Sequence, residues 1–218
     1  MKKSVVNVLA AALVLGSVGA AKASLVITWP SATNAPPTGV AGLDASGLNP
    51  FPQNLMGYEG GFLTAKDAGS YVFTYLGMGD PSFTNTFSVS GCGVTFVNQT
   101  TTVGTSFTCN FAANTQIPFT FTANTTGSSP WPKTVTNGQT YSNGLGFLAS
   151  MTNSTASTAS AAGTSVYLGL SDGASTSDKD FQDLVVRVDE VPEPASFAVL
   201  GVGLLGLGIA WSRRRARA

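Results

Sequence analysis

The chain has 218 residues, of which 11 are basic, 11 are acidic and none is histidine, so its formal net charge is zero. With no histidine and only two cysteines, the sequence excludes the usual zinc and copper sites. Charged and apolar residues are spread unevenly, and both ends differ in composition from the middle.

The N-terminal segment has the composition of an export signal. Lys2 and Lys3 precede an apolar stretch from Val5 to Ala21, and Ala21-Lys22-Ala23 has the small-x-small pattern of a signal peptidase site. We therefore predict a signal peptide over residues 1–23, which signal peptidase cleaves after Ala23. An uncleaved membrane anchor is the alternative.

Residues 24–190 are predicted to form one domain, long enough to bury a hydrophobic core. This part of the chain holds ten acidic side chains and four basic ones, so its net charge is −6. The basic residues are Lys66, Lys133, Lys179 and Arg187. A nucleic-acid partner needs a basic surface, and the sequence therefore argues against one.

Period-two alternation of apolar and polar side chains is the dominant pattern of this domain. It is clearest around Tyr71 to Tyr75, Phe119 to Thr122 and Leu184 to Val188, and it predicts half-buried strands. Further strands are predicted over Leu25 to Trp29, Phe83 to Val89, Val94 to Val97, Thr105 to Phe111 and Val166 to Leu170. Short strands with glycine-rich connections predict an all-β fold, an antiparallel β-sandwich of jelly-roll type.

Two stretches of the domain are predicted to be loops. Residues 30–61 contain five prolines, and residues 150–165 are almost entirely small or polar, which leaves little apolar area to bury.

The only two cysteines, Cys92 and Cys109, are predicted to form a disulfide, because they lie in an exported domain. We expect them on the core faces of adjacent strands, with Val94 opposite Phe107 and a turn near Gln99 to Thr102.

Several catalytic patterns have simpler explanations. Gly169-Leu170-Ser171-Asp172-Gly173 matches the G-x-S-x-G nucleophile pattern, but without histidine as a base it is predicted to be a turn. Gly201 to Gly206 matches a dinucleotide fingerprint, but it follows no strand. Two of the carboxylates Glu59, Asp67 and Asp80 would serve a secreted aspartate-dependent hydrolase, whereas isolated surface carboxylates are the commoner case.

Four aspartates precede the last predicted strand and form a candidate metal site. They are Asp172, Asp178, Asp180 and Asp183. Clustered carboxylates repel one another, and Ca²⁺ would relieve that repulsion through hard oxygen ligands, although the spacing is not that of an EF-hand. A solvated acidic turn, with local side-chain to backbone hydrogen bonds, remains the alternative.

The string Asp178-Lys179-Asp180-Phe181-Gln182-Asp183-Leu184-Val185 resembles the D-x-D-[FY]-x-D-[LM]-[VI] signature of an uncharacterised β-rich domain of bacterial surface proteins. The resemblance covers about residues 166–188, and Gln182 stands where that family often has asparagine.

The C-terminal segment, residues 191–218, has three parts that a soluble fold does not require. Pro192-Glu193-Pro194 interrupts regular structure, and an apolar run from Ala195 to Trp211 follows. The run is 17 residues long, slightly short of the roughly 20 that span a bilayer. The basic end is formed by Arg213, Arg214, Arg215 and Arg217, which are expected to hold the C-terminus in the cytoplasm.

These three parts resemble the PEP-CTERM sorting signal of Gram-negative bacteria, which is sometimes labelled an ice-binding C-terminal domain. The resemblance implies recognition by an exosortase while a transmembrane helix holds the chain in the inner membrane. It also implies a final location at the cell surface or in the extracellular matrix, in association with exopolysaccharide or biofilm. The threonines show no fixed-period array that would support ice binding.

The sequence therefore predicts an exported protein without catalytic activity. A calcium-stiffened adhesin, a carbohydrate-binding module and the aspartate-dependent hydrolase remain as alternatives. For a carbohydrate-binding module, three aromatic side chains would stack on sugar rings: Trp29, Trp131 and Tyr141. Packing in the core or in loops explains the same residues equally well.

Overall fold

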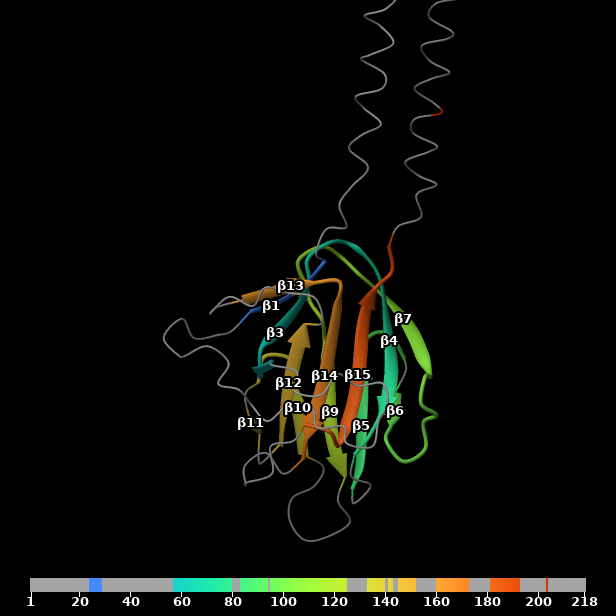
Figure 1. Ribbon diagram of the computed structural model, residues 1–218, viewed down its shortest axis with the longest axis vertical. Helices are drawn as coiled ribbons and strands as arrows, with labels where there is room; N and C mark the ends of the chain where they lie inside the picture. The colour runs from blue at the N-terminus through green and yellow to red at the C-terminus, as the bar shows by residue number, and fades with distance from the viewer. Residues whose placement is uncertain are drawn as a thin grey trace, which may run out of the picture. The chain divides into compact units, whose positions relative to one another are not determined.

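The computed structural model describes the β-rich middle of the chain. The described residues are 24–28, 57–79, 83–93, 95–124, 133–139, 141–142, 145–151, 160–172 and 181–192, together with Gly203. All of them except Pro192 and Gly203 belong to one compact unit, Ala23–Val191. Every strand pairing among them is antiparallel, as the alternating pattern predicts (Figure 1).

The strands form three sheets. The large sheet has the order β11-β12-β14-β15-β4-β7, with β2 also paired to β12. Its strands are β2 (Tyr58–Glu59), β4 (Gly69–Gly77), β7 (Ser106–Phe111), β11 (Tyr141–Ser142), β12 (Leu145–Met151), β14 (Ser165–Ser171) and β15 (Leu184–Glu190).

The other two sheets have four strands each. The facing sheet has the order β10-β9-β5-β6, and the N-terminal sheet has the order β13-β1-β3-β8. Their strands are β1 (Leu25–Thr28), β3 (Phe62–Ala65), β5 (Thr84–Val89), β6 (Thr95–Val97), β8 (Thr115–Gln116), β9 (Phe119–Asn124), β10 (Lys133–Thr136) and β13 (Ser160–Gly163).

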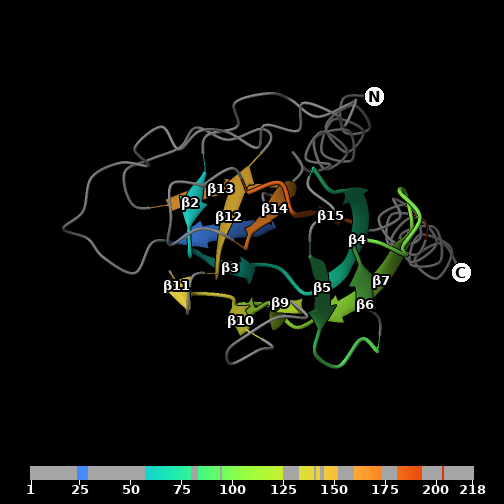
Figure 2. The same ribbon diagram turned by 90° about the horizontal axis from the view of Figure 1, so that it is seen from below.

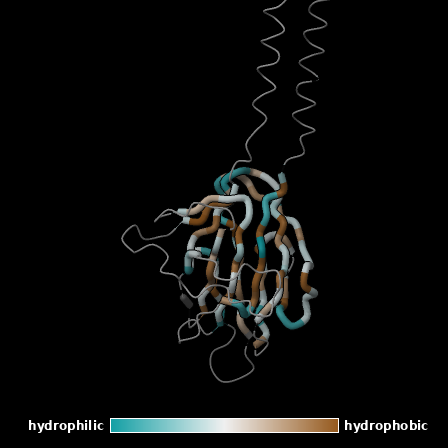
Figure 3. Tube along the Cα trace, viewed as in Figure 1, coloured by the Kyte–Doolittle hydropathy of each residue, from teal (hydrophilic) through white to brown (hydrophobic). Residues whose placement is uncertain are grey.

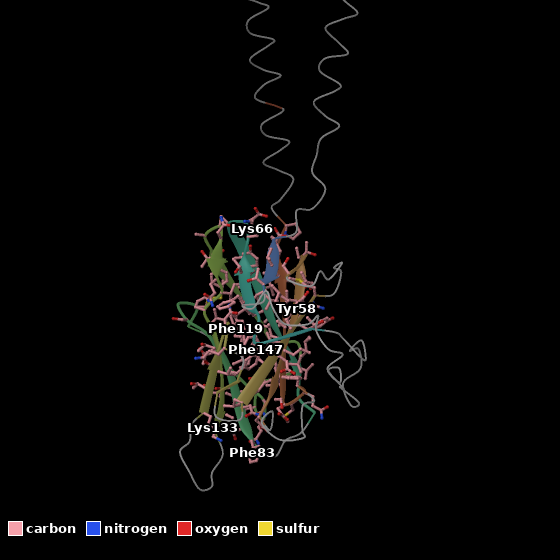
Figure 4. All side chains as sticks on the ribbon, turned by 90° about the vertical axis from the view of Figure 1, so that its left-hand side faces the viewer. Tyr58, Lys66, Phe83, Phe119, Lys133 and Phe147 are labelled. Atoms are coloured by element: carbon pink, nitrogen blue, oxygen red, sulfur yellow. A yellow bond between two sulfur atoms is a disulfide. The ribbon has the colours of Figure 1, made fainter. Side chains whose placement is uncertain are left out.

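The large sheet and the facing sheet pack face to face and form a sandwich, with β9 and β10 opposite β12 and β14 (Figure 2). Their inner faces meet in a layer of aromatic rings. Phe87 on β5 has its ring centroid 6.0 Å from that of Phe73 on β4, and Phe119 on β9 lies 5.1 Å from Phe147 on β12 (Figure 4). Along the strands, hydrophobic and polar residues alternate visibly (Figure 3). The predicted antiparallel sandwich is therefore confirmed.

The N-terminal sheet is joined to the facing sheet through Asn137, a buried residue in the turn after β10. Its side-chain oxygen accepts a hydrogen bond from the backbone N–H of Leu63 on β3 at 2.8 Å. Its side-chain nitrogen donates to the carbonyl oxygens of Leu63 and Ile117, at 2.7 and 2.8 Å. The amide group thus satisfies backbone atoms of β3 in the way that a neighbouring strand would.

All the strands predicted from alternation are present, with ends that differ by a few residues. On β4 the side chains of Tyr71, Phe73 and Tyr75 are buried and Thr74 between them is half-buried, as predicted. Trp29 and Val94, which the predicted strands included, lie outside the described residues.

The loop prediction for residues 150–165 is wrong at both ends. β12 continues to Met151, and β13 occupies Ser160–Gly163, where small side chains fit against the buried β1. The predicted loop 30–61 likewise contains the short strand β2. The predicted turn at Gly169 to Gly173 is also incorrect in part, because β14 extends to Ser171, whose side chain is buried.

The predicted disulfide is present, with a Cys92–Cys109 sulfur to sulfur distance of 2.01 Å, but the predicted strand pairing around it is wrong. Cys92 lies in the turn after β5, and Cys109 lies on β7 of the large sheet. β6 and β7 belong to different sheets, and their rings Phe96 and Phe107 meet across the core at 4.9 Å. Alternation fixes which face of a strand is buried, but it does not fix which strand is its neighbour.

We predict that Cys92→Ser, Cys109→Ser and the double variant each lower the free energy of unfolding by about 3 kcal/mol, because the 17-residue loop is no longer closed. Chemical denaturation of the exported protein measures this loss. The double variant should lose no more than either single variant, since all three lack the same bond. Alkylation of two thiols in the natively folded wild-type protein would refute the disulfide.

Phe87→Ala should lower the free energy of unfolding by about 3–5 kcal/mol, because it removes a fully buried ring from the aromatic layer. The matched control is Phe83→Ala, just before β5, where the side chain is 40% exposed and a change within about 0.5 kcal/mol is expected. Equal losses in the two variants would contradict the role assigned to the aromatic layer.

Candidate functional site

A buried polar cluster lies at the end of the sandwich marked by Phe83 in Figure 4. We call it the Asn85 cluster, and it consists of Asn85, Asn98, Asp172 and Asp183. Asn85 is on β5 and Asn98 follows β6 of the facing sheet, whereas Asp172 follows β14 and Asp183 precedes β15 of the large sheet. The cluster therefore connects the two sheets of the sandwich.

Asn85 and Asn98 are joined by hydrogen bonds from main-chain and side-chain atoms. The backbone N–H of Asn85 donates to Asn98 Oδ1 at 3.0 Å, and the backbone N–H of Asn98 donates to the carbonyl oxygen of Asn85 at 2.9 Å. Asn98 Nδ2 donates to the carbonyl oxygens of Phe83 and Asp183, at 2.9 and 3.2 Å. Asn98 therefore connects the start of β5 to the residue that precedes β15.

Tyr75 on β4 of the large sheet contacts the Asn85 cluster through its hydroxyl group. Its hydroxyl donates to the carbonyl oxygen of Asn98 at 2.8 Å, and burial raises the pKa of Tyr75 to about 12. The phenol thus stays protonated, and remains a hydrogen-bond donor, throughout the neutral and moderately alkaline pH range.

The two aspartates of the cluster, Asp172 and Asp183, are neighbours in the structure. Asp183 Oδ2 accepts a hydrogen bond from the backbone N–H of Asp172 at 2.7 Å, and the backbone N–H of Asp183 donates to the carbonyl oxygen of Leu170 at 3.0 Å. Asp172 Oδ2 accepts a hydrogen bond from Asn85 Nδ2 at 2.9 Å. Only the bond from the Asp172 backbone N–H joins a side chain to the backbone within the acidic segment, and Asp183 is only 6% exposed, so this end of the segment is not solvated.

The segment before β15 is anchored by Phe181, whose side chain is fully buried although its backbone φ is +52°. It packs against Leu148 and Val185, which alternate with core residues and so lie on the other face of the large sheet. The backbone N–H of Gly79 donates to the carbonyl oxygen of Gln182 at 2.8 Å, and a Cβ at Gly79 would come within 2.4 Å of the Gln182 side chain. The Phe-x-Asp part of the aspartate motif therefore fixes Asp183 in place.

The other predicted members of the aspartate site, Asp178 and Asp180, lie outside the described residues. Among the residues that the structure describes, no group of three or more acidic, histidine or cysteine side chains is placed to hold a metal ion. Calcium binding by all four aspartates therefore stays a prediction.

The carboxylates considered for hydrolysis come from separate elements. Glu59 lies on β2, and Asp67 lies in the turn between β3 and β4, where its carbonyl oxygen accepts a hydrogen bond from Tyr71 Oη at 2.7 Å. Their neighbours Tyr58 and Lys66 lie at different heights of the domain in Figure 4. Asp80 lies outside the described residues, as do Trp29 and Trp131, and of Tyr141 only the backbone, on β11, is described.

Asn85 and Asn98 were missed by sequence reasoning, although one of them carries a signal. Alternation along β5 places Asn85 on the same face as Phe87 and Val89, so a polar side chain was to be expected at a core position. A polar residue in such a position requires a buried partner. Asn98 carries no comparable signal, because it follows the short strand β6 in a turn.

The predicted processing sites at the two ends lie largely outside the described residues. Among them are Ala21, Ala23, Glu193, Pro194, Arg213, Arg214 and Arg215. Ser24 is fully buried, and its carbonyl oxygen accepts a hydrogen bond from the backbone N–H of Lys66 at 2.6 Å. Pro192 follows β15 by two residues. No helix within the described residues has the length and hydrophobicity that a membrane span requires.

Comparison with known proteins identifies the C-terminal segment. The PEP-CTERM protein-sorting motif matches residues 190–215, which include Pro192-Glu193-Pro194 and the first arginines of the basic end. No curated protein and no solved structure matches the chain. The chain therefore carries a PEP-CTERM protein-sorting motif and is an exported protein that an exosortase-type system sorts.

Proposed function

We propose that the protein is a non-catalytic component of the cell surface or extracellular matrix, whose tail an exosortase removes during export. The sorting motif at residues 190–215 carries this proposal. In the same proposal, the mature protein accompanies exopolysaccharide and contributes to biofilm.

The way in which the domain ends supports removal of the tail. β15 is an inner strand of the large sheet, paired on both sides, and it ends at Glu190. The backbone N–H of Val191 still donates to the carbonyl oxygen of Ser70 at 2.9 Å. A cut near Pro194 would therefore remove no strand of the sandwich, and the two prolines keep the cut site out of regular structure.

The composition of the domain supports a neutral polysaccharide as partner. The net charge of −6 over residues 24–190 would repel acidic polymers, whereas the exposed face of β7 offers uncharged polar side chains. The exposed residues of β7 are Ser106, Thr108 and Asn110. Such groups bind sugar hydroxyls through hydrogen bonds without a change in charge.

We predict that, in a host with an exosortase, surface-released protein lacks the residues beyond about Pro194. Pro192→Ala with Pro194→Ala should accumulate unprocessed in the inner membrane, because recognition depends on the Pro-Glu-Pro segment. Intact mass of the released protein, with immunoblotting of membrane fractions, measures both outcomes. Pro36→Ala with Pro37→Ala is the matched control and should be processed normally. Released full-length chain ending in Ala218 would return the tail to an ordinary membrane anchor.

On a glycan array, the mature protein should bind neutral polysaccharides and not acidic ones, because of its negative charge. Thr108→Lys should weaken this binding and leave the melting temperature within about 2 °C of wild type, since the side chain is exposed. Binding confined to acidic glycans would contradict the proposed partner.

A further inference from the structure

Asn85 is a buried amide whose side chain reaches the carboxylate of Asp172. Its side chain is fully buried, and its Nδ2 donates to Asp172 Oδ2, but among the described residues its Oδ1 has no hydrogen-bond partner. A buried polar atom in this state destabilises the fold unless a water or an ion satisfies it. Because Phe87 and Val89 on the same face of β5 are hydrophobic, an apolar residue at position 85 would avoid this cost.

The groups around Asn85 are the ligand types that Ca²⁺ prefers. An amide oxygen and two carboxylates are hard oxygen donors, and Ca²⁺ takes six to eight such ligands in flexible geometry. The carboxylate of Asp172 accepts a hydrogen bond from Asn85 Nδ2, and its backbone N–H donates to Asp183 Oδ2, so the three residues are neighbours. The remaining ligands would be water or backbone carbonyl oxygens.

The charges at this site also favour a divalent cation. Asp183 is almost completely buried, and its Oδ2 accepts a hydrogen bond from the backbone N–H of Asp172, a residue that carries a second carboxylate. Two like charges in a poorly solvated place destabilise each other, and a nearby divalent cation stabilises both ionised forms.

We infer that Asn85 Oδ1 and the carboxylates of Asp172 and Asp183 form a calcium site that links the facing sheet to the large sheet. Asn85 belongs to β5, and the two aspartates flank the ends of β14 and β15. The ion would thus reinforce the junction that Asn98 makes through hydrogen bonds. Calcium sites of extracellular modules bind with dissociation constants of about 10⁻⁴ to 10⁻³ M, which suits an exported protein.

The test uses the exported, disulfide-intact protein, first treated with EDTA and then given calcium chloride. The melting temperature should rise by about 3–6 °C at a calcium concentration tenfold above Kd, and magnesium should have little effect. Terbium luminescence, displaced by calcium, should report the same site directly.

Asn85→Leu and Asp172→Asn should each lose the calcium-dependent shift and weaken terbium binding at least tenfold. Asn85→Asp retains an oxygen ligand at position 85 and should bind calcium at least as tightly as wild type. If Asn85→Leu fails to fold, Asn85→Asp is the variant that tests the site. Asp67→Asn removes the same charge from the turn between β3 and β4 and should leave the shift unchanged.

Identical melting curves in EDTA and in 10 mM calcium, with no terbium signal, would overturn the inference and leave a water molecule as the partner of Asn85. A full calcium shift in both Asn85→Leu and Asp172→Asn would place the ion elsewhere. Neither result bears on removal of the tail, which is measured separately by intact mass.

Discussion

The packing of aromatic rings between the large sheet and the facing sheet is the interaction on which the rest of the structure depends. Phe87 is at its centre, with ring centroids 5.0 Å from Phe121, 5.8 Å from Phe119 and 6.1 Å from Phe96. On β5 and β9 these rings alternate with threonine and serine, so the apolar side of each strand faces the large sheet and the polar side faces away from it. The Asn85 cluster lies at the end of this layer and joins residues of both sheets, so it forms only when the two sheets are packed face to face.

Buried asparagines control how the three sheets are joined. Asn137 connects the N-terminal sheet to the facing sheet, and Asn98 connects the facing sheet to the large sheet. Hydrophobic contact is non-directional, whereas an amide that satisfies two or three backbone atoms requires a defined geometry. The aromatic layer thus provides most of the attraction between sheets, and these amides restrict their relative position.

Alternation predicted the strands that have one buried face, and it failed where that condition does not hold. β12 was missed because all seven of its residues are buried, which gives a largely apolar run without alternation. β13 was missed because its small residues, Ser160 to Gly163, resemble a linker until the buried β1 lies beside them. Asp172 and Asp183 were predicted as neighbours because they flank one connection between strands. Asn85 and Asn98 come from a different sheet, and sequence alone does not place them beside those aspartates.

The pairing of β1 with β13 imposes an order on the biogenesis of the protein. Leu25 lies opposite Gly163, so the first strand to emerge from a translocation channel pairs with one of the last. Its other edge pairs with β3, which lies much closer in the sequence, so the pairing with β13 is the long-range step for this strand. Loop closure over such a distance is slow, and chains that wait with unpaired strands are prone to aggregate. The four-stranded N-terminal sheet is therefore complete only once β13, near the end of the domain, is available to pair with β1 at its beginning.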